Sequence, residues 1–100
     1  MDASNGDGKR WTFLTNHARV LIHIAGNPNT RVRDIAERIS ITERTTQGIV
    51  NDLEEASYIT RTRVGRRNRY EVQHGGKFRH PGESHGSVDD LLKIFVPTRR

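Results

Sequence analysis

Two short segments with apolar residues at helical spacing lie only three residues apart in the middle of the chain. In the first, apolar side chains recur at positions i, i+3, i+4 and i+7, namely Val32, Ile35, Ala36 and Ile39. In the second, the inward stripe is Thr46, Ile49, Val50 and Leu53. This pattern predicts a helix over residues 32–39 and another over 43–56, the latter capped by Thr42. A three-residue turn therefore joins the two predicted helices.

The flanking segments predict one further helix on the N-terminal side and a β-hairpin on the C-terminal side. Asn16 is placed to cap a helix over residues 17–26, which would bury Val20, Leu21 and Ile24. Asn27-Pro28-Asn29 predicts a turn, followed by Thr30 as a helix cap or a short strand residue. β-type residues at 59–64 and 69–72 flank a four-residue loop at 65–68, and a short helix is expected over 88–96.

Size and composition limit the classes of protein to which the chain can belong. One hundred residues make one domain, and zero cysteines exclude disulfides and thiolate metal sites. The apolar runs are too short to span a membrane, so we expect a soluble, cytoplasmic protein. Phosphate-binding loops and nucleophile motifs are absent, so neither an enzyme nor a bound cofactor is expected.

Two segments have little apolar content. Residues 1–10 are polar and glycine-rich and are interpreted as a disordered tail, and 73–87 as an extended connection. The predicted organisation is therefore a core domain at 11–72, the connection, and a terminal helix with its tail at 88–100. The histidines of the connection, His74, His80 and His85, lack neighbouring ligands at helical spacing and are interpreted as loop residues rather than metal ligands.

The positive charge is concentrated in one short segment. Residues 61–69 contain five arginines and no acid, so the remaining 12 basic residues balance the 12 acidic ones, and the net charge of +5 belongs to this segment. Unopposed guanidinium groups favour a polyanion such as a phosphate backbone. Arginines 61, 63 and 69 are expected to project from one face, with 66 and 67 in the loop. The predicted backbone-binding residues are Arg61, Arg63, Arg66, Arg67, Arg69, Thr30, Arg31 and Thr42.

The outward stripe of the helix over residues 43–56 carries hydrogen-bonding groups. Arginine, glutamine and asparagine match the donor and acceptor patterns of base edges in the major groove of DNA. The predicted base-reading residues are Arg44, Thr45, Gln47, Gly48 and Asn51. Gly48 either allows close approach to DNA or is a tolerated exposed glycine.

The order of these segments resembles a winged helix-turn-helix protein. Residues 34–59, DIAERISITERTTQGIVNDLEEASYI, followed by TRTRVGRRNRYEV, resemble the small prokaryotic regulators of the MarR-like group. The resemblance implies a mainly α fold with a small β-hairpin, in which the third helix reads DNA and the hairpin is a wing on the backbone. Ser40 and Ser57 stand where glycine is common in that group, which suggests modest strain or an altered turn, and Thr46 stands where valine is common.

Large apolar residues outside the winged helix suggest a homodimer. We expect the N-terminal segment and the last helix to pack across a two-fold axis through Trp11, Phe13, Leu14, Leu91, Leu92, Ile94 and Phe95. The alternative is that the last helix folds back on its own protomer. The function predicted from the sequence is a sequence-specific regulator of transcription that binds double-stranded DNA and acts as a repressor. A protein-interaction module and a non-specific nucleic-acid binder remain as alternatives. The sequence does not indicate an effector.

Overall fold

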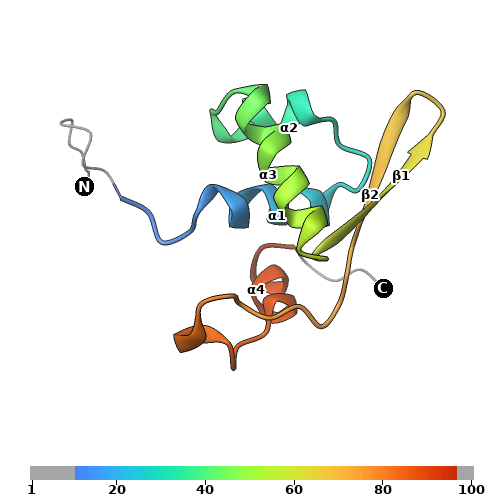
Figure 1. Ribbon diagram of the computed structural model, residues 1–100. Coiled ribbons are helices and arrows are strands. Elements are labelled where there is room, and N and C mark those ends of the chain that lie inside the picture. Colours follow the sequence, from blue (N-terminus) through green and yellow to red (C-terminus); the bar gives the residue numbers. More distant parts are fainter. Residues whose placement is uncertain (1–10, 97–100) are drawn as a thin grey trace.

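The apolar stripes form a three-helix core with a two-stranded wing, as the sequence predicts (Figure 1). The computed structural model describes residues 11–96, so the predicted tail at 1–10 lies outside the described residues. The elements are α1 (Asn16–Gly26), α2 (Val32–Ile39), α3 (Glu43–Glu55), β1 (Ile59–Val64), β2 (Arg67–Val72), the 3-10 turn η1 (Pro81–Glu83) and α4 (Val88–Phe95). The mainly helical winged helix with an added C-terminal helix is confirmed.

The helix ends follow from short polar side chains and two left-handed residues. Thr15, not Asn16, caps α1, because its hydroxyl accepts from the Ala18 N–H at 3.2 Å. Thr42 caps α3 as predicted, accepting from the Thr45 N–H at 3.0 Å. Thr30 caps no helix, since Arg31 occupies the N-cap of α2.

A serine with a positive φ follows both helices: Ser40 directly after α2, with a φ of 61°, and Ser57 two residues after α3, with a φ of 69°. In each case the N–H of the next residue reaches back five positions, from Ile41 to Ala36 and from Tyr58 to Leu53. This bond pattern favours glycine at the left-handed position, because glycine has no Cβ to clash there. The strain that the sequence suggested at these two serines is therefore present.

One apolar core joins all four helices to the hairpin. Val20, Ile24, Ile35 and Val50 supply its centre, and Tyr70 of β2 is buried against them. Val88 and Leu92 place α4 in this same core, where it packs along α1 (Figure 1).

The hairpin turn is tighter than the predicted four-residue loop. Val64 pairs with Arg67 and Arg63 with Asn68, so only Gly65 and Arg66 lie between the strands. Gly65 has a φ of 64°, the left-handed backbone that a two-residue hairpin turn requires. Arg67 and Asn68 therefore belong to β2, because this turn allows the ladder to continue to the strand ends.

The connection at residues 73–87 is more structured than predicted. It contains η1 and an isolated antiparallel bridge between Lys77 and Ser87. The Tyr58 hydroxyl donates to the Lys77 carbonyl, and the half-buried Phe78 packs on the core. These contacts lead the chain back so that α4 can reach α1.

Candidate nucleic-acid interface

The outward stripe of α3 presents polar groups to solvent. Arg44, Thr45, Gly48 and Asn51 are exposed and Gln47 is half-buried, whereas the predicted inward stripe is buried throughout. The Gln47 amide donates to the Asn51 Oδ1 at 3.1 Å, which leaves the carbonyl of Gln47 and the amide nitrogen of Asn51 free of this bond. The stripe thus keeps both a donor and an acceptor, the two kinds of group that base edges in the major groove can pair with.

The surroundings of Gly48 are open. A Cβ added at Gly48 would meet no atom within 4 Å, so packing inside the protein does not require glycine there. Gly48 lies between the turns that carry Arg44 and Asn51, on the exposed side of α3. Packing within the protein therefore does not account for the glycine.

The five arginines of the hairpin are divided between its two faces, contrary to the expectation that 61, 63 and 69 share one. Because Arg61 pairs with Tyr70 and Thr62 with Arg69, Arg61 and Arg63 lie on the face that buries Tyr70. Arg67 and Arg69 lie on the opposite face. The expectation was wrong because it continued the alternation of odd and even positions from one strand into the other. Across the hairpin, odd-numbered residues of β1 pair with even-numbered residues of β2, so Arg69 shares a face with Thr62 and not with Arg61.

Arg61 is neutralised inside the protein. Its Nη2 lies 2.6 Å from the Glu54 Oε1 at the end of α3, and both side chains are about one-third exposed. Arg61 therefore links β1 to α3. The sequence suggested that Arg61 is an unopposed cation, and this interpretation was wrong. The sequence did not indicate Glu54 as a partner, because it lies seven residues away on a different element.

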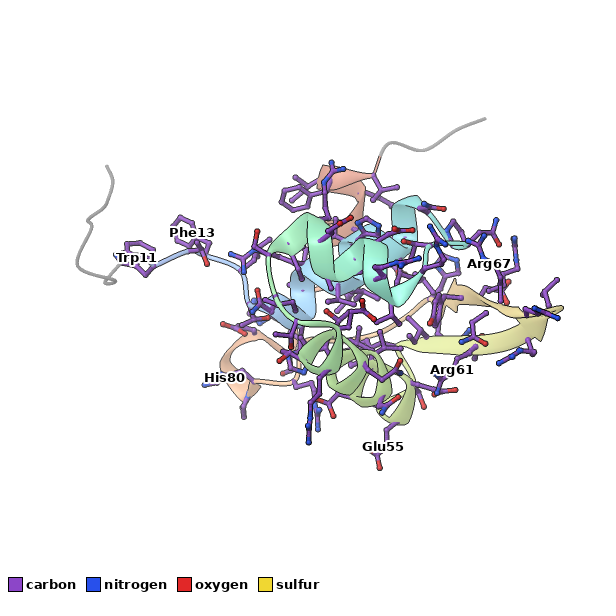
Figure 2. All side chains as sticks on the ribbon, turned by 90° about the horizontal axis from the view of Figure 1, so that it is seen from above. Trp11, Phe13, Glu55, Arg61, Arg67 and His80 are labelled. Atoms are coloured by element: carbon purple, nitrogen blue, oxygen red, sulfur yellow. The ribbon has the colours of Figure 1, made fainter. Side chains whose placement is uncertain are left out.

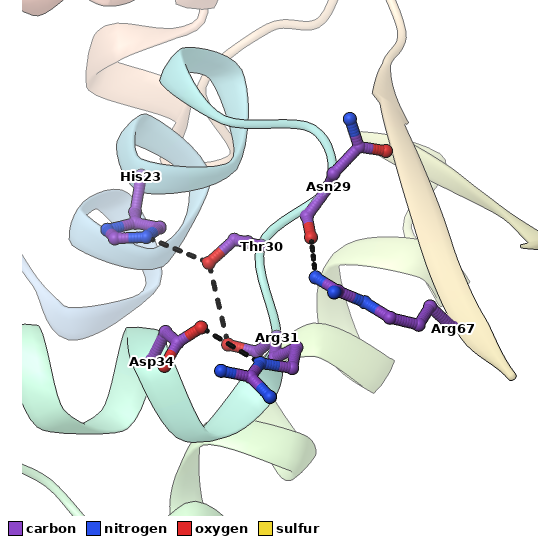
Figure 3. A network of polar contacts seen from close by, with 6 residues as sticks. All are labelled: His23, Asn29, Thr30, Arg31, Asp34 and Arg67. Atoms are coloured by element: carbon purple, nitrogen blue, oxygen red, sulfur yellow. Dashed lines mark hydrogen bonds and ion pairs between the residues drawn. The ribbon is translucent and has the colours of Figure 1, made fainter.

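Arg67 and Arg69 contact the turn that joins α1 to α2. The Arg67 Nη2 donates to the Asn29 backbone carbonyl at 2.8 Å (Figure 3). The Arg69 Nη1 donates to the Asn29 Oδ1 at 3.2 Å. These acceptors are neutral, so both arginines keep their positive charge. The sequence marked Asn29 only as part of a turn, and no local pattern indicates its pairing with residues 38 and 40 positions away.

The tip of the wing carries the remaining cationic groups. Arg66 lies exposed in the turn, and Arg63 is exposed with its Nε donating to the Gly65 carbonyl at 3.1 Å. Within residues 11–96 no acid forms an ion pair with any hairpin arginine except Arg61. Four cationic groups without a carboxylate partner thus remain on the wing.

Of the other residues predicted to contact a phosphate backbone, Thr30 was predicted wrongly. Thr30 is only 3% exposed, and its hydroxyl lies 3.0 Å from the His23 Nε2, so it is a buried structural residue (Figure 3). Arg31 is exposed and pairs with Asp34 at 3.1 Å. Thr42 is exposed, but its hydroxyl is occupied with capping α3 and with donating to the Thr45 Oγ1.

The histidines of the described chain have separate structural settings. His74 lies 3.5 Å from Asp89, and the His80 Nδ1 accepts from the Gly82 N–H at the start of η1. Burial lowers the pKa of His23, and the nearby Arg38 lowers this pKa further. Across residues 11–96, no group of three or more potential ligands is arranged to hold a metal ion.

The residues predicted at a dimer interface are of three kinds: exposed, half-buried and buried. Trp11 and Phe13 are 76% and 91% exposed on the segment before α1, where their rings meet edge to face (Figure 2). Ile94 is 71% and Phe95 49% exposed on α4. Leu14 and Leu91 are half-buried. Leu92 does not belong to this set, because it is 7% exposed within the core of its own protomer.

Within the described part of the chain, no helix is long and apolar enough to cross a bilayer.

A comparison with curated proteins finds no match. A family model described as the MarR family matches residues 12–69, which include α1, the α2–α3 pair and most of the wing. The chain therefore belongs to the MarR family and carries the winged helix domain of a DNA-binding transcription regulator.

Proposed function

We propose that the protein is a sequence-specific repressor that binds double-stranded DNA as a homodimer. The observation that carries the proposal is the wing, on which four arginines lack a carboxylate partner among the described residues, next to a helix with an outward stripe of hydrogen-bonding groups. α3 would enter the major groove, and the wing would bind the phosphate backbone. This division assigns sequence readout to Arg44, Thr45, Gln47 and Asn51, and backbone binding to the arginines.

The homodimer is supported by the exposed apolar side chains at both ends of the described chain. Trp11 and Phe13 precede α1, and Ile94 and Phe95 lie on the outer side of α4. Large apolar groups left in water commonly mark an interface. A two-fold dimer would place two copies of α3 in successive turns of a palindromic site, about 34 Å apart. Occupation of such a site within a promoter would exclude RNA polymerase.

Selection of duplex DNA from a random pool tests the proposal. We expect an enriched palindrome whose affinity falls with salt by about 0.9 log units per log unit of salt for each phosphate bound. Arg66→Ala should weaken binding to cognate and random DNA alike and reduce the salt slope. Arg79→Ala removes the same charge from an exposed site outside the wing and serves as the matched control.

Two outcomes would contradict the proposal. Absence of duplex binding at about 50 mM salt, where phosphate contacts are strong, would exclude DNA as the partner. Salt-resistant binding to another protein would then support the protein-interaction alternative. Binding without any enriched sequence would instead support a non-specific nucleic-acid binder.

A further inference from the structure

The turn between α1 and α2 holds two wing arginines through a single residue. Asn29 accepts from Arg67 with its backbone carbonyl, at 2.8 Å (Figure 3). It also accepts from Arg69 with its side-chain Oδ1, at 3.2 Å. Arg67 and Arg69 are two positions apart in β2 and therefore project from the same face of the hairpin. One residue outside the wing thus contacts both guanidinium groups of that face.

Asn29 is itself fixed on both sides. The preceding residue, Pro28, accepts the backbone N–H of Tyr70 at 2.8 Å, and Tyr70 is buried in the core. The following residue, Thr30, is buried, bonded to His23, and linked by its N–H to the Asn27 carbonyl at 3.0 Å. The backbone of Asn29 is therefore held in place beside the wing, since neither of its neighbours can move without breaking one of these contacts.

Asn29 and Glu54 affect the charge of their arginine partners differently. Arg61 pairs with the Glu54 carboxylate, which cancels its charge. Asn29 offers only amide oxygens, which orient a guanidinium group without neutralising it. A guanidinium has five N–H donors, so a single bond to Asn29 leaves donors for a phosphate.

We infer that Asn29 is a positioning residue that holds Arg69, together with Arg67, in the orientation in which the wing binds the DNA backbone. Long side chains lose rotational freedom when they bind, and a contact that restricts them beforehand lowers this cost. Asn29 acts through the arginines and touches no nucleotide itself. The inference rests on the proposed role of the wing in DNA binding.

A double-mutant cycle with duplex DNA tests the inference. Asn29→Ala removes the Oδ1 that holds Arg69 and should lower affinity roughly two- to tenfold, the cost of ordering one long side chain on binding. In an Arg69→Ala background, Asn29→Ala should have little further effect. In an Arg66→Ala background its full effect should persist, because Arg66 makes no contact with Asn29. Asn27→Ala, in the same turn, is the matched control and should leave affinity unchanged.

Asn29→Asp separates positioning from a general structural role. The aspartate keeps an acceptor at the same place but supplies a carboxylate, so it should pair with Arg69 and cancel its charge. We expect this variant to keep its melting temperature, to bind DNA less tightly and to show a smaller salt slope. Asn29→Ala should keep the wild-type slope, because the phosphate contact still forms.

The outcomes distinguish this inference from the function on which it depends. Equal losses from Asn29→Ala in the wild-type and Arg69→Ala backgrounds would overturn the positioning role while DNA binding stands. An unchanged salt slope in Asn29→Asp would also contradict it. If the wild-type protein binds no duplex, the proposed function fails first and the inference with it.

Discussion

At the scale of single residues, the chain carries local strain at two helix ends. Ser40 and Ser57 adopt left-handed backbone where α2 and α3 terminate. A side chain in this conformation costs about 1–2 kcal/mol, because its Cβ approaches the following carbonyl. The resemblance to the MarR-like group marked both positions in advance, because glycine is common there in that group.

Replacement of Ser40 by glycine should therefore stabilise the protein. We expect Ser40→Gly to raise the free energy of unfolding by about 0.5–1 kcal/mol, because relief of strain exceeds the added entropy of the unfolded chain. Urea denaturation measures the change. Ser84→Gly is the control: Ser84 has a φ of −67°, so glycine there should be neutral or destabilising. No gain for Ser40→Gly would show that the turn accommodates serine without strain.

His23 should make stability depend on pH. Burial and Arg38 lower the pKa of His23 in the folded protein, while Asp34 opposes them. The unfolded chain therefore takes up the proton first, and stability should decline as pH falls from about 6.5 towards the lowered pKa. His23→Gln should reduce the loss of melting temperature between pH 7.5 and 5.5, whereas His85→Gln, at an exposed site, should not. An identical loss in both variants would assign the pH dependence to other groups.

At the scale of elements, helix prediction succeeded where strand prediction was only partly correct. The interior of α3 follows the 3.6-residue period, so its inward and outward stripes were assigned correctly from spacing alone. In the hairpin, Arg67 and Asn68 carry no strand signal of their own. They belong to β2 because Gly65 forms a two-residue turn, and the ladder then pairs them with Val64 and Arg63. This register also decides which arginines share a face.

The exposed stripe of α3 leads to a prediction on specificity. Gln47→Ala or Asn51→Ala should cost about 1–3 kcal/mol on the selected DNA and little on random DNA, because these amides are assigned to base edges. The ratio of the two dissociation constants, measured at one salt concentration, reports the change. Glu55→Gln, further along the same outward stripe, should leave the ratio unaltered. Equal losses on both DNAs would remove these residues from base recognition.

At the scale of the whole molecule, α4 has one face in the protomer core and another exposed to solvent. Val88 and Leu92 join the protomer core, while Ile94 and Phe95 remain exposed on the same helix. The last helix thus packs on its own protomer through one face, and the exposed face is the one assigned to the proposed dimer. The buried face is a property of the structure, and pairing through the exposed face remains a proposal.

Substitutions on the two faces of α4 should have different consequences. Ile94→Asp places a charge on the exposed face and should give a monomer near 11.4 kDa in sedimentation, against twice that mass for the wild type. Leu92→Ala should instead lower the free energy of unfolding by about 2–5 kcal/mol through a cavity in the core. Val64→Asp, at an exposed apolar site on the wing, is the control for Ile94→Asp. A wild-type protein that sediments as a monomer would exclude the dimer.

The sequence alone determined the helices, the helix-turn-helix interval and the concentration of charge in one hairpin. These features depend on residues close together in the chain, so period, capping groups and local charge are sufficient to indicate them. The tertiary structure alone decided how the arginines are used, because Glu54 neutralises Arg61 and Asn29 orients Arg67 and Arg69. Contacts across 38 or 40 residues depend on strand register and on how the core packs, and no local pattern contains either.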